Sequence, residues 1–259
     1  MTAVEVSYSI DGPADAPVVV LANSLGASRG MWDPQVPALA ERYRVISYDA
    51  RGHGDSPSPP GPCTLDDLVD DVVALLDRVG AERAHLVGVS LGGMTAMRMA
   101  VREPQRVHRA VLLCTSASTT AGPYLERAAA VRRGGTAPLA PAVVSRWVTP
   151  AFAAEHPEVV RRLEAMVAGA DDEGYAACCE VVAAVELRAD LPRISAPTLV
   201  VSGADDQALP PEHQRVIADG IPGARLVTLS PAAHIPTVEQ PLQVTGAILG
   251  HLDAAGDQR

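Results

Sequence analysis

The chain has 259 residues, 47% of them hydrophobic, and a formal net charge of −10, which suits one large α/β domain or one domain with an insertion. The acidic balance argues against nucleic acid or an anionic membrane as the partner. No apolar run approaches the roughly 18 residues that a membrane span needs. All 21 basic residues are arginines, which excludes a lysine Schiff base or a P-loop lysine.

The N-terminal segment has no basic residue before Arg29 and no long apolar block, so we expect no secretory signal and a cytoplasmic protein. The four cysteines lack metal-ligand spacing, and we interpret them as small buried hydrophobic residues: Cys63, Cys114, Cys178 and Cys179. We therefore expect no metal and no cofactor.

The first half of the chain alternates between strand-like and helix-like segments. Short apolar runs predict strands at Val4 to Ile10, Val18 to Leu21, Arg44 to Tyr48, His85 to Val89 and Ala110 to Leu113. Between the third and fourth, residues 65–80 repeat apolar side chains at helical spacing behind Thr64, a residue suited to cap a helix. This alternation predicts an α/β fold with a mostly parallel, doubly wound sheet.

From about residue 117 the strand signal stops, and helical patterns cover residues 124–133, 142–148, 157–167 and 175–188. Strand signal returns at 197–203 and 224–230, and an apolar helix over 243–252 closes the chain. We therefore predict a core formed by residues 1–116 and 191–259, interrupted by an all-helical cap at 117–190.

The strongest chemical signal follows the fourth predicted strand. Residues 88–92, GVSLG, fit the pattern GxSxG, in which a serine lies on a strained turn between a strand and a helix. Glycines two residues on either side avoid a collision in that turn. We identify Ser90 as the candidate nucleophile; the alternative is an ordinary glycine-rich turn.

A nucleophilic serine needs a base, and the base needs an orienting carboxylate. In α/β-hydrolases these follow in the order serine, acid, histidine, and GADDQALPP followed by PAAHIPT supplies Asp205, Asp206 and then His234. Neighbouring residues in an extended turn point opposite ways, so only one aspartate can face the histidine, and we choose Asp206. CTSAS, after the strand ending at Leu113, contains no carboxylate, which excludes the other acid position.

Six other histidines compete with His234. His53, in RGHGDS, precedes the serine and breaks the expected order. We interpret the remaining five as surface or packing residues: His85, His108, His156, His213 and His251.

The second predicted strand ends abruptly in Asn23-Ser24-Leu25-Gly26. Hydrolysis of an ester places negative charge on the carbonyl oxygen, and two backbone N–H groups commonly stabilise it. One comes from the residue after the nucleophile, here Leu91, and the other from a loop after an earlier strand. We therefore predict the N–H of Leu25 as the second donor.

The chain resembles the 3-oxoadipate enol-lactonases of the β-ketoadipate pathway over nearly its whole length. The segments that carry the resemblance are NSLG, MWDPQVPALAERYRVISYDARGHGDS, GVSLGGM, RWVTPAF, GYAACCE, GADDQALPPEH and PAAHIPTVEQP. The resemblance implies the α/β-hydrolase fold and hydrolysis of an enol-lactone through an acyl-enzyme on Ser90, in aromatic catabolism. The chain departs from it at Tyr124, often Trp in the family, and at Glu186, often Asp. Both lie in the part expected to shape substrate choice.

The implied substrate carries a carboxylate, so an acidic protein must provide a local cation. The candidates lie in the cap: Arg132, which we prefer, Arg133 and Arg146, with Trp147 beside them. For each arginine the alternative is a solvated helix face. The alternative activities are those of another esterase, a lactonase or a cofactor-free perhydrolase, including a biosynthetic one, and a non-catalytic ligand-binding protein. The sequence does not fix the oligomeric state.

Overall fold

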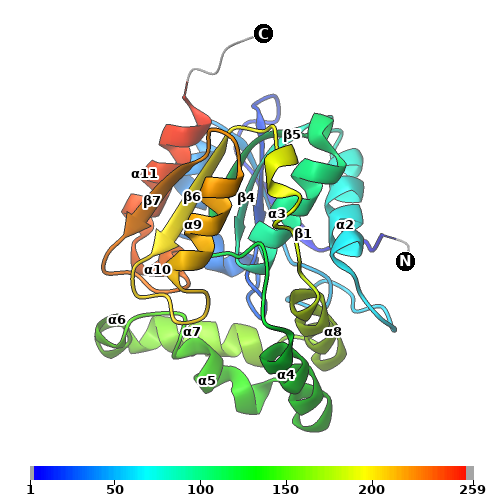
Figure 1. Ribbon diagram of the computed structural model, residues 1–259, viewed down its shortest axis with the longest axis vertical. Coiled ribbons are helices and arrows are strands. Elements are labelled where there is room, and N and C mark those ends of the chain that lie inside the picture. Colours follow the sequence, from blue (N-terminus) through cyan, green and yellow to red (C-terminus); the bar gives the residue numbers. More distant parts are fainter. Residues whose placement is uncertain (1–2, 255–259) are drawn as a thin grey trace.

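A computed structural model, in which residues 3–254 are described, has a seven-stranded sheet at its centre (Figure 1). The strands are β1 (Tyr8–Asp11), β2 (Val18–Ala22), β3 (Arg44–Tyr48), β4 (Ala84–Val89), β5 (Val107–Leu113), β6 (Thr198–Gly203) and β7 (Arg225–Leu229). They lie in the order β1-β3-β2-β4-β5-β6-β7, and every neighbouring pair is parallel except β1 with β3. The predicted α/β fold with a mostly parallel sheet is confirmed.

The core helices are α1 (Val36–Ala40), α2 (Leu65–Arg78), α3 (Leu91–Arg102), α9 (Pro211–Gly220), α10 (Pro236–Glu239) and α11 (Pro241–Leu252). Short 3₁₀ turns are η1 (Arg29–Trp32), η2 (Pro104–Arg106), η3 (Ala137–Leu139) and η4 (Leu191–Arg193). Helices α2, α3 and α9 lie on one face of the sheet, while α1 and α11 contact each other on the opposite face. Within residues 3–254 no helix is both long and apolar enough to cross a membrane.

Helix α2 illustrates how local sequence sets an element. The Thr64 hydroxyl accepts a hydrogen bond from the backbone N–H of Asp67, and the Asp67 carboxylate accepts one from the backbone N–H of Thr64. This reciprocal cap satisfies two N–H groups that would otherwise lack partners. The apolar stripe that begins at Leu68 is buried, as its spacing predicts.

The first strand begins later than the sequence predicts. The backbone N–H of Val4 donates to Asp71 at 2.8 Å, and that of Ser7 donates to the Ser56 hydroxyl at 2.8 Å. Because these donors bond to side chains and not to a neighbouring strand, the ladder with β3 starts only at Tyr8. The prediction of a strand from Val4 was therefore wrong over its first residues.

Five helices lie between β5 and β6 in sequence and form a separate layer at the bottom of Figure 1. They are α4 (Ala121–Gly134), α5 (Ala140–Val144), α6 (Pro150–Glu155), α7 (Pro157–Ala168) and α8 (Asp172–Ala183). The pattern predicted a helix up to Arg188, but α8 ends at Ala183, and Glu186 forms an isolated bridge with Ser118. We use the name cap for residues 117–190; its standing as a separate domain stays a prediction.

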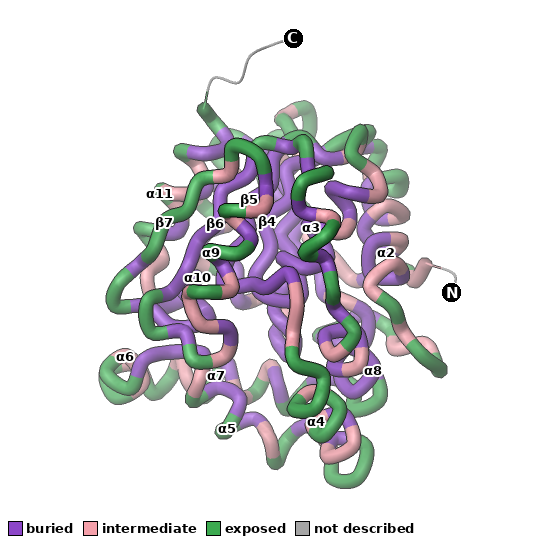
Figure 2. Tube along the Cα trace, viewed as in Figure 1, coloured by how far each residue is buried: buried purple, intermediate pink, exposed green. Residues whose placement is uncertain are grey.

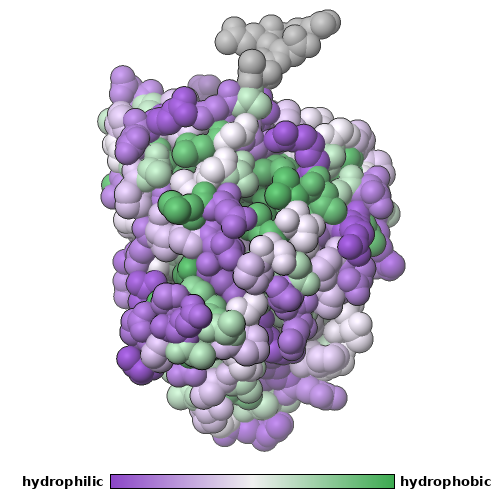
Figure 3. All heavy atoms as spheres, turned by 90° about the vertical axis from the view of Figure 1, so that its left-hand side faces the viewer, coloured by the Kyte–Doolittle hydropathy of each residue, from purple (hydrophilic) through white to green (hydrophobic). Residues whose placement is uncertain are grey.

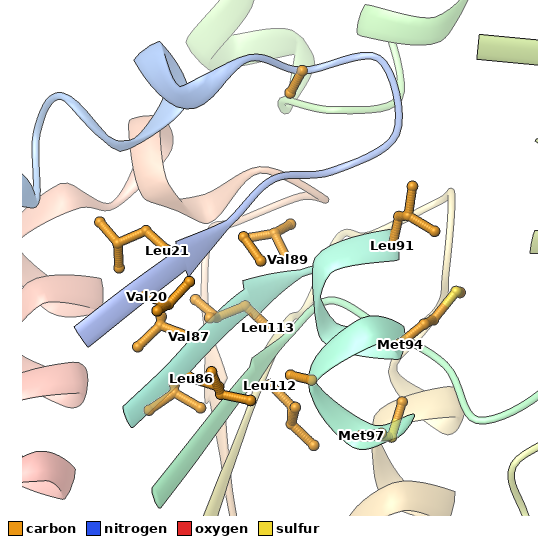
Figure 4. Packing of buried hydrophobic residues seen from close by; sticks show 14 of the residues in the cluster. Val20, Leu21, Leu86, Val87, Val89, Leu91, Met94, Met97, Leu112 and Leu113 are labelled. Carbon is orange, nitrogen blue, oxygen red and sulfur yellow. The ribbon is translucent and has the colours of Figure 1, made fainter. Parts of the chain in front are cut away.

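The main core lies where β2, β4 and β5 meet helix α3. Figure 2 shows buried residues along the strands and exposed residues on the outer cap helices. Around the start of α3, ten labelled residues pack together in Figure 4: Val20, Leu21, Leu86, Val87, Val89, Leu91, Met94, Met97, Leu112 and Leu113. The turn that carries Ser90 therefore rests on a dry, closely packed support.

Strand β7 forms one edge of the sheet. Its residues Leu226 and Val227 are 37% and 38% exposed. Figure 3 views the molecule from the side on which β7 and α11 lie in Figure 1, and apolar side chains gather on the upper part of this face.

Candidate active site

Ser90 lies at the sharp turn between β4 and α3. Its φ of 54° and ψ of −114° are a strained backbone conformation for a residue with a side chain. The backbone N–H of Ser90 donates to the carbonyl of Leu113 at 3.0 Å, which fixes the turn to the next strand. A Cβ on Gly88 would lie 2.4 Å from the carbonyl carbon of Gly92, so the motif glycines permit the crossing of strand and helix.

Gly92 provides a prediction about stability. A Cβ there would lie 2.3 Å from the carbonyl oxygen of Ala22, which is backbone in the middle of the sheet and cannot move freely. We expect Gly92→Ala to lower the free energy of unfolding by about 1–3 kcal/mol or more, measured by urea denaturation. Gly246→Ala is the matched control because that exposed helical position has open space around it, and it should gain up to about 1 kcal/mol. Equal effects at both sites would contradict the steric argument.

The loops after β6 and β7 bring Asp206 and His234 together. The imidazole Nδ1 lies 2.8 Å from Asp206 Oδ2, and both residues are 3% exposed. Asp206 Oδ1 accepts hydrogen bonds from the backbone N–H groups of Ala208 and Leu209 at 2.8 and 2.9 Å. Two backbone hydrogen-bond donors thus hold the Asp206 carboxylate in place. Its contact with the imidazole favours the His234 tautomer that carries a proton on Nδ1 and a lone pair on Nε2.

Asp205, the alternative acid, points elsewhere. It is exposed, and its Oδ2 accepts a hydrogen bond from the backbone N–H of Ala232 at 3.1 Å. Its own backbone N–H donates to the carbonyl of Ala232 at 2.8 Å. Asp205 therefore joins the two loops that carry Asp206 and His234 without contacting the imidazole.

Glu239, on α10, connects the histidine loop to the cap. Its Oε1 accepts hydrogen bonds from the backbone N–H of Thr149, at 3.0 Å, and from the Thr149 hydroxyl, while Oε2 accepts one from the N–H of Ala233 at 2.8 Å. On the other side of His234, the N–H of Ile235 donates to the carbonyl of Trp147 at 2.8 Å. The sequence carries no local signal for this connection, because its ends are 90 residues apart.

The structure explains why an asparagine, Asn23, follows β2. The Asn23 side chain donates to the carbonyl of Tyr48 at 2.9 Å and accepts from the Trp32 indole at 3.1 Å. Its backbone carbonyl accepts from Gly92 N–H at 3.0 Å, which holds the loop against the start of α3. Among the turn and loop hydrogen bonds of residues 3–254, none uses the backbone N–H of Leu25 or Leu91. Leu91 is also the first residue of α3, where a backbone N–H has no partner within the helix. Both predicted oxyanion donors are therefore available.

A cavity of about 220 Å³ lies between the core and the cap. Ser24, Leu25, Ser90 and His234 line it from the core, and Val143, Trp147 and Val182 line it from the cap. Its volume is below the roughly 300–1,000 Å³ of pockets for drug-sized ligands. The space therefore suits a small molecule held against Ser90.

Four arginines of the cap fall into two groups, those that line the cavity and those that do not. Arg146 lines the cavity, and so does Arg127, which the sequence analysis missed. Within residues 3–254 neither forms an ion pair with a carboxylate; the Arg127 guanidinium carbon lies 5.3 Å from the centre of the Tyr124 ring. Helix α4 has no clear apolar stripe, so its sequence alone does not show which arginine turns inward.

The preference for Arg132 is corrected. Its guanidinium forms ion pairs with Glu173, at 2.6 Å, and Glu180 on α8, at the surface and outside the cavity lining. Five residues along a helix turn the side chain by about 140°, so Arg132 and Arg127 cannot share a face. Arg133 is exposed and is also absent from the lining, whereas Trp147 is part of it.

His213, interpreted from the sequence as a packing or surface residue, also lines the cavity. Its Nδ1 lies 2.7 Å from the hydroxyl of Ser116, which itself donates to the carbonyl of Ser118. Because that hydroxyl has one proton, His213 Nδ1 must donate to it, and Nε2 remains for a ligand. His53, the other competitor, is buried against the carbonyl of Arg51 and does not line the cavity.

Comparison with known proteins assigns the chain to a family. The sequence profile of the alpha/beta hydrolase fold matches residues 17–241. The chain belongs to the α/β-hydrolase fold family. The predicted hydrolase fold is thereby confirmed, together with the arrangement of sheet and helices.

Relatives of this α/β-hydrolase include lactonases. It is 38% identical to 3-oxoadipate enol-lactonase 2 of Acinetobacter baylyi over 95% of this chain and 92% of that protein. The crystal structure of the enol-lactonase from Burkholderia xenovorans is 39% identical, with a TM-score of 0.94 over 96% of each chain. A putative carbamate hydrolase RutD of Stutzerimonas stutzeri is 30% identical over 92% of each. The resemblance to enol-lactonases is confirmed.

Proposed function

We propose that this α/β-hydrolase is a serine hydrolase that opens a small, carboxylate-bearing enol-lactone, with 3-oxoadipate enol-lactone as its substrate. The observation that carries the proposal is one small cavity lined by Ser90, His234 and two arginines without carboxylate partners in residues 3–254. The sequence identity to enol-lactonases supports the choice of lactone.

In the proposed reaction, His234 Nε2 removes the proton of the Ser90 hydroxyl, whose oxygen attacks the lactone carbonyl. Asp206 stabilises the imidazolium that forms and keeps its ring in place. The N–H groups of Leu25 and Leu91 donate to the oxyanion. The ring C–O bond then breaks, and His234 gives its proton to the departing enolate. His234 then activates a water molecule, which hydrolyses the acyl-enzyme in the same manner.

The leaving group distinguishes an enol-lactone from an ordinary ester. Cleavage of the ring releases an enolate, whose charge is delocalised and which becomes a ketone after protonation at carbon. The departure is therefore easy, and conversion to the ketone makes ring opening hard to reverse. The protein therefore needs mainly to position the lactone ring and to bind the substrate carboxylate, and a small cavity bordered by arginines can do both.

The test is an ultraviolet assay that follows loss of 3-oxoadipate enol-lactone, run beside a simple p-nitrophenyl ester and a carbamate. We expect kcat/KM to be highest for the enol-lactone. A higher value for the p-nitrophenyl ester would indicate a general esterase. Preference for the carbamate would indicate an activity like that named for the RutD relative.

Arg146 is our candidate for the substrate carboxylate. The neighbouring Trp147 carbonyl is fixed by the N–H of Ile235, so Arg146 lies on the part of the cap that is tied to the His234 loop. A charge-assisted hydrogen bond contributes roughly 1.5–3 kcal/mol, or about 10- to 100-fold in kcat/KM. Arg146→Met should lower kcat/KM for the enol-lactone by about that factor and affect a neutral ester of similar size far less.

The matched control is Arg132→Met, which removes a cap arginine that is already paired at the surface. It should change kcat/KM for either substrate by less than about threefold. Equal losses for charged and neutral substrates in Arg146→Met would mean that Arg146 only supports the cap. No loss for either would move the carboxylate site to Arg127.

A further inference from the structure

A second, smaller cavity lies away from Ser90, between helix α8 and the loop that precedes α2. Its volume is about 10 Å³, close to the space that one water molecule needs. Loop and helix approach each other closely: a Cβ on Gly174 would lie 2.5 Å from Gly52 Cα and 2.7 Å from the Ser58 hydroxyl. The two walls of this cavity are therefore held together by backbone contact.

Two free thiols, one from each wall, line this cavity. Cys63 belongs to the loop and is partly exposed, which corrects its interpretation as a buried hydrophobic residue. Cys178 belongs to α8 and is fully buried. One thiol is open to a small oxidant, and the other is shielded from solvent at the same place.

A buried cation completes the site. Arg51 is 3% exposed, and its Nε and Nη2 each lie 2.7 Å from the carboxylate of Asp71. Nη1 has no hydrogen-bond partner within residues 3–254, although Arg51 lines the cavity that both thiols share. An unpartnered buried N–H needs an acceptor, and a thiolate or a small polar molecule in the cavity can provide one.

The surroundings of the two thiols shift their pKa values in opposite directions. Contact with the Cys178 thiol and the nearby positive charge of Arg51 lower the pKa of Cys63 in spite of partial burial. Contact with Cys63 and burial raise the pKa of Cys178 well above its ordinary value. Nucleophilic attack on an oxidant requires a thiolate with access to solvent, so Cys63 is the thiol that reacts first.

We propose that Cys63 is a peroxide-reactive modification site and that its oxidised form condenses with Cys178 to form a disulfide. The Cys63 thiolate attacks one oxygen of a hydroperoxide and forms a sulfenic acid, while the O–O bond breaks and releases hydroxide or alkoxide. The Cys178 sulfur then attacks the sulfenic sulfur, the S–S bond forms, and the hydroxyl leaves as water with the Cys178 proton. Sulfur is oxidised by two electrons, and the peroxide is reduced by two.

The cavity that holds Cys63 and Cys178 shares no lining residue with the cavity that holds Ser90, but helix α8 borders both. Val182, four residues after Cys178, lines the cavity that holds Ser90. A disulfide would join the loop before α2 to this wall of the substrate cavity. The proposal is nevertheless independent of the hydrolytic function, and its test needs no substrate.

The experiment exposes the reduced wild-type protein to hydrogen peroxide and determines its intact mass and a peptide map under non-reducing conditions. We expect the loss of two hydrogen atoms and a cross-linked peptide pair that contains Cys63 and Cys178. Cys178→Ser should instead gain one oxygen atom at Cys63, trapped by dimedone. Cys63→Ser should show neither change, and Cys179→Ser should behave like the wild type because Cys179 lies on the same helix outside the cavity lining.

A second measurement needs no variant. In the native wild-type protein, iodoacetamide should alkylate Cys63 at least about tenfold faster than Cys114 or Cys179, since thiolate character and exposure control the rate. Similar rates at all four cysteines would overturn the assignment of Cys63. A Cys63 sulfenic acid that persists in the wild type, or a bridge to any other cysteine, would overturn the pairing with Cys178.

Discussion

Ser90→Ala should abolish hydrolysis while the protein stays folded. The hydroxyl is the proposed nucleophile, and alanine has a side chain no larger than serine at this strained turn. We expect kcat below about a thousandth of the wild-type value, as is usual when a member of a catalytic triad is removed. Steady-state assays with the enol-lactone measure this effect, and circular dichroism checks the fold.

Ser24→Ala provides the matched control because Ser24 lines the same cavity without a proposed part in bond formation. Its kcat should stay within about tenfold of the wild type, or ~1.4 kcal/mol in the barrier. A fluorophosphonate should add covalently to the wild type and to Ser24→Ala, but not to Ser90→Ala. A kcat of Ser90→Ala above about a thousandth of the wild-type value, or no labelling of the wild type, would contradict the proposed mechanism.

Asp206→Asn should lower kcat by about 10⁴ because it changes the tautomer of His234. The two N–H groups of Ala208 and Leu209 point at the Oδ1 position, so the amide oxygen of asparagine would occupy it. The amide nitrogen would then face His234 Nδ1 and donate to it. The imidazole proton would move to Nε2, leaving no lone pair to accept the proton of Ser90.

Asp205→Asn is the matched control for this substitution. The amide oxygen of asparagine can still accept the hydrogen bond from the N–H of Ala232. We expect kcat to fall less than about tenfold, since this contact joins loops at the surface. If Asp205→Asn caused the larger loss, the assignment of the orienting carboxylate would be reversed.

The sequence predicted the strands and the Ser90 turn well because their signals are local. A short apolar run bounded by turn residues marks a buried strand, and the glycines of residues 88–92 mark the crossing of β4 and α3. Asp206 and His234 could be proposed because parallel strands deliver their following loops to the same edge of the sheet. The late start of β1 could not be predicted, since it depends on the distant side chain of Asp71.

The cap was harder to interpret for a physical reason. The sequence favours Arg132 and does not single out Arg127, which lines the cavity, because α4 is rich in Ala and Arg and its sequence does not distinguish its faces. The direction of the Arg132 side chain depends on two glutamates of helix α8, Glu173, which is 41 residues away, and Glu180. Cys63 was misjudged similarly, because its exposure follows from how the loop before α2 lies against α8.

The contact of Glu239 with Thr149 and Ala233 has a consequence for protein engineering. A cap exchanged between relatives would remove the two hydrogen bonds that Thr149 donates to Glu239 and leave this buried carboxylate with only the N–H of Ala233 as a donor. Removing the partners of a buried carboxylate is costly, and here the loss would act on the loop that carries His234. A chimeric enzyme should therefore keep residues 147–149 of the parent, because these residues connect the cap to the loop that carries His234, the proposed base.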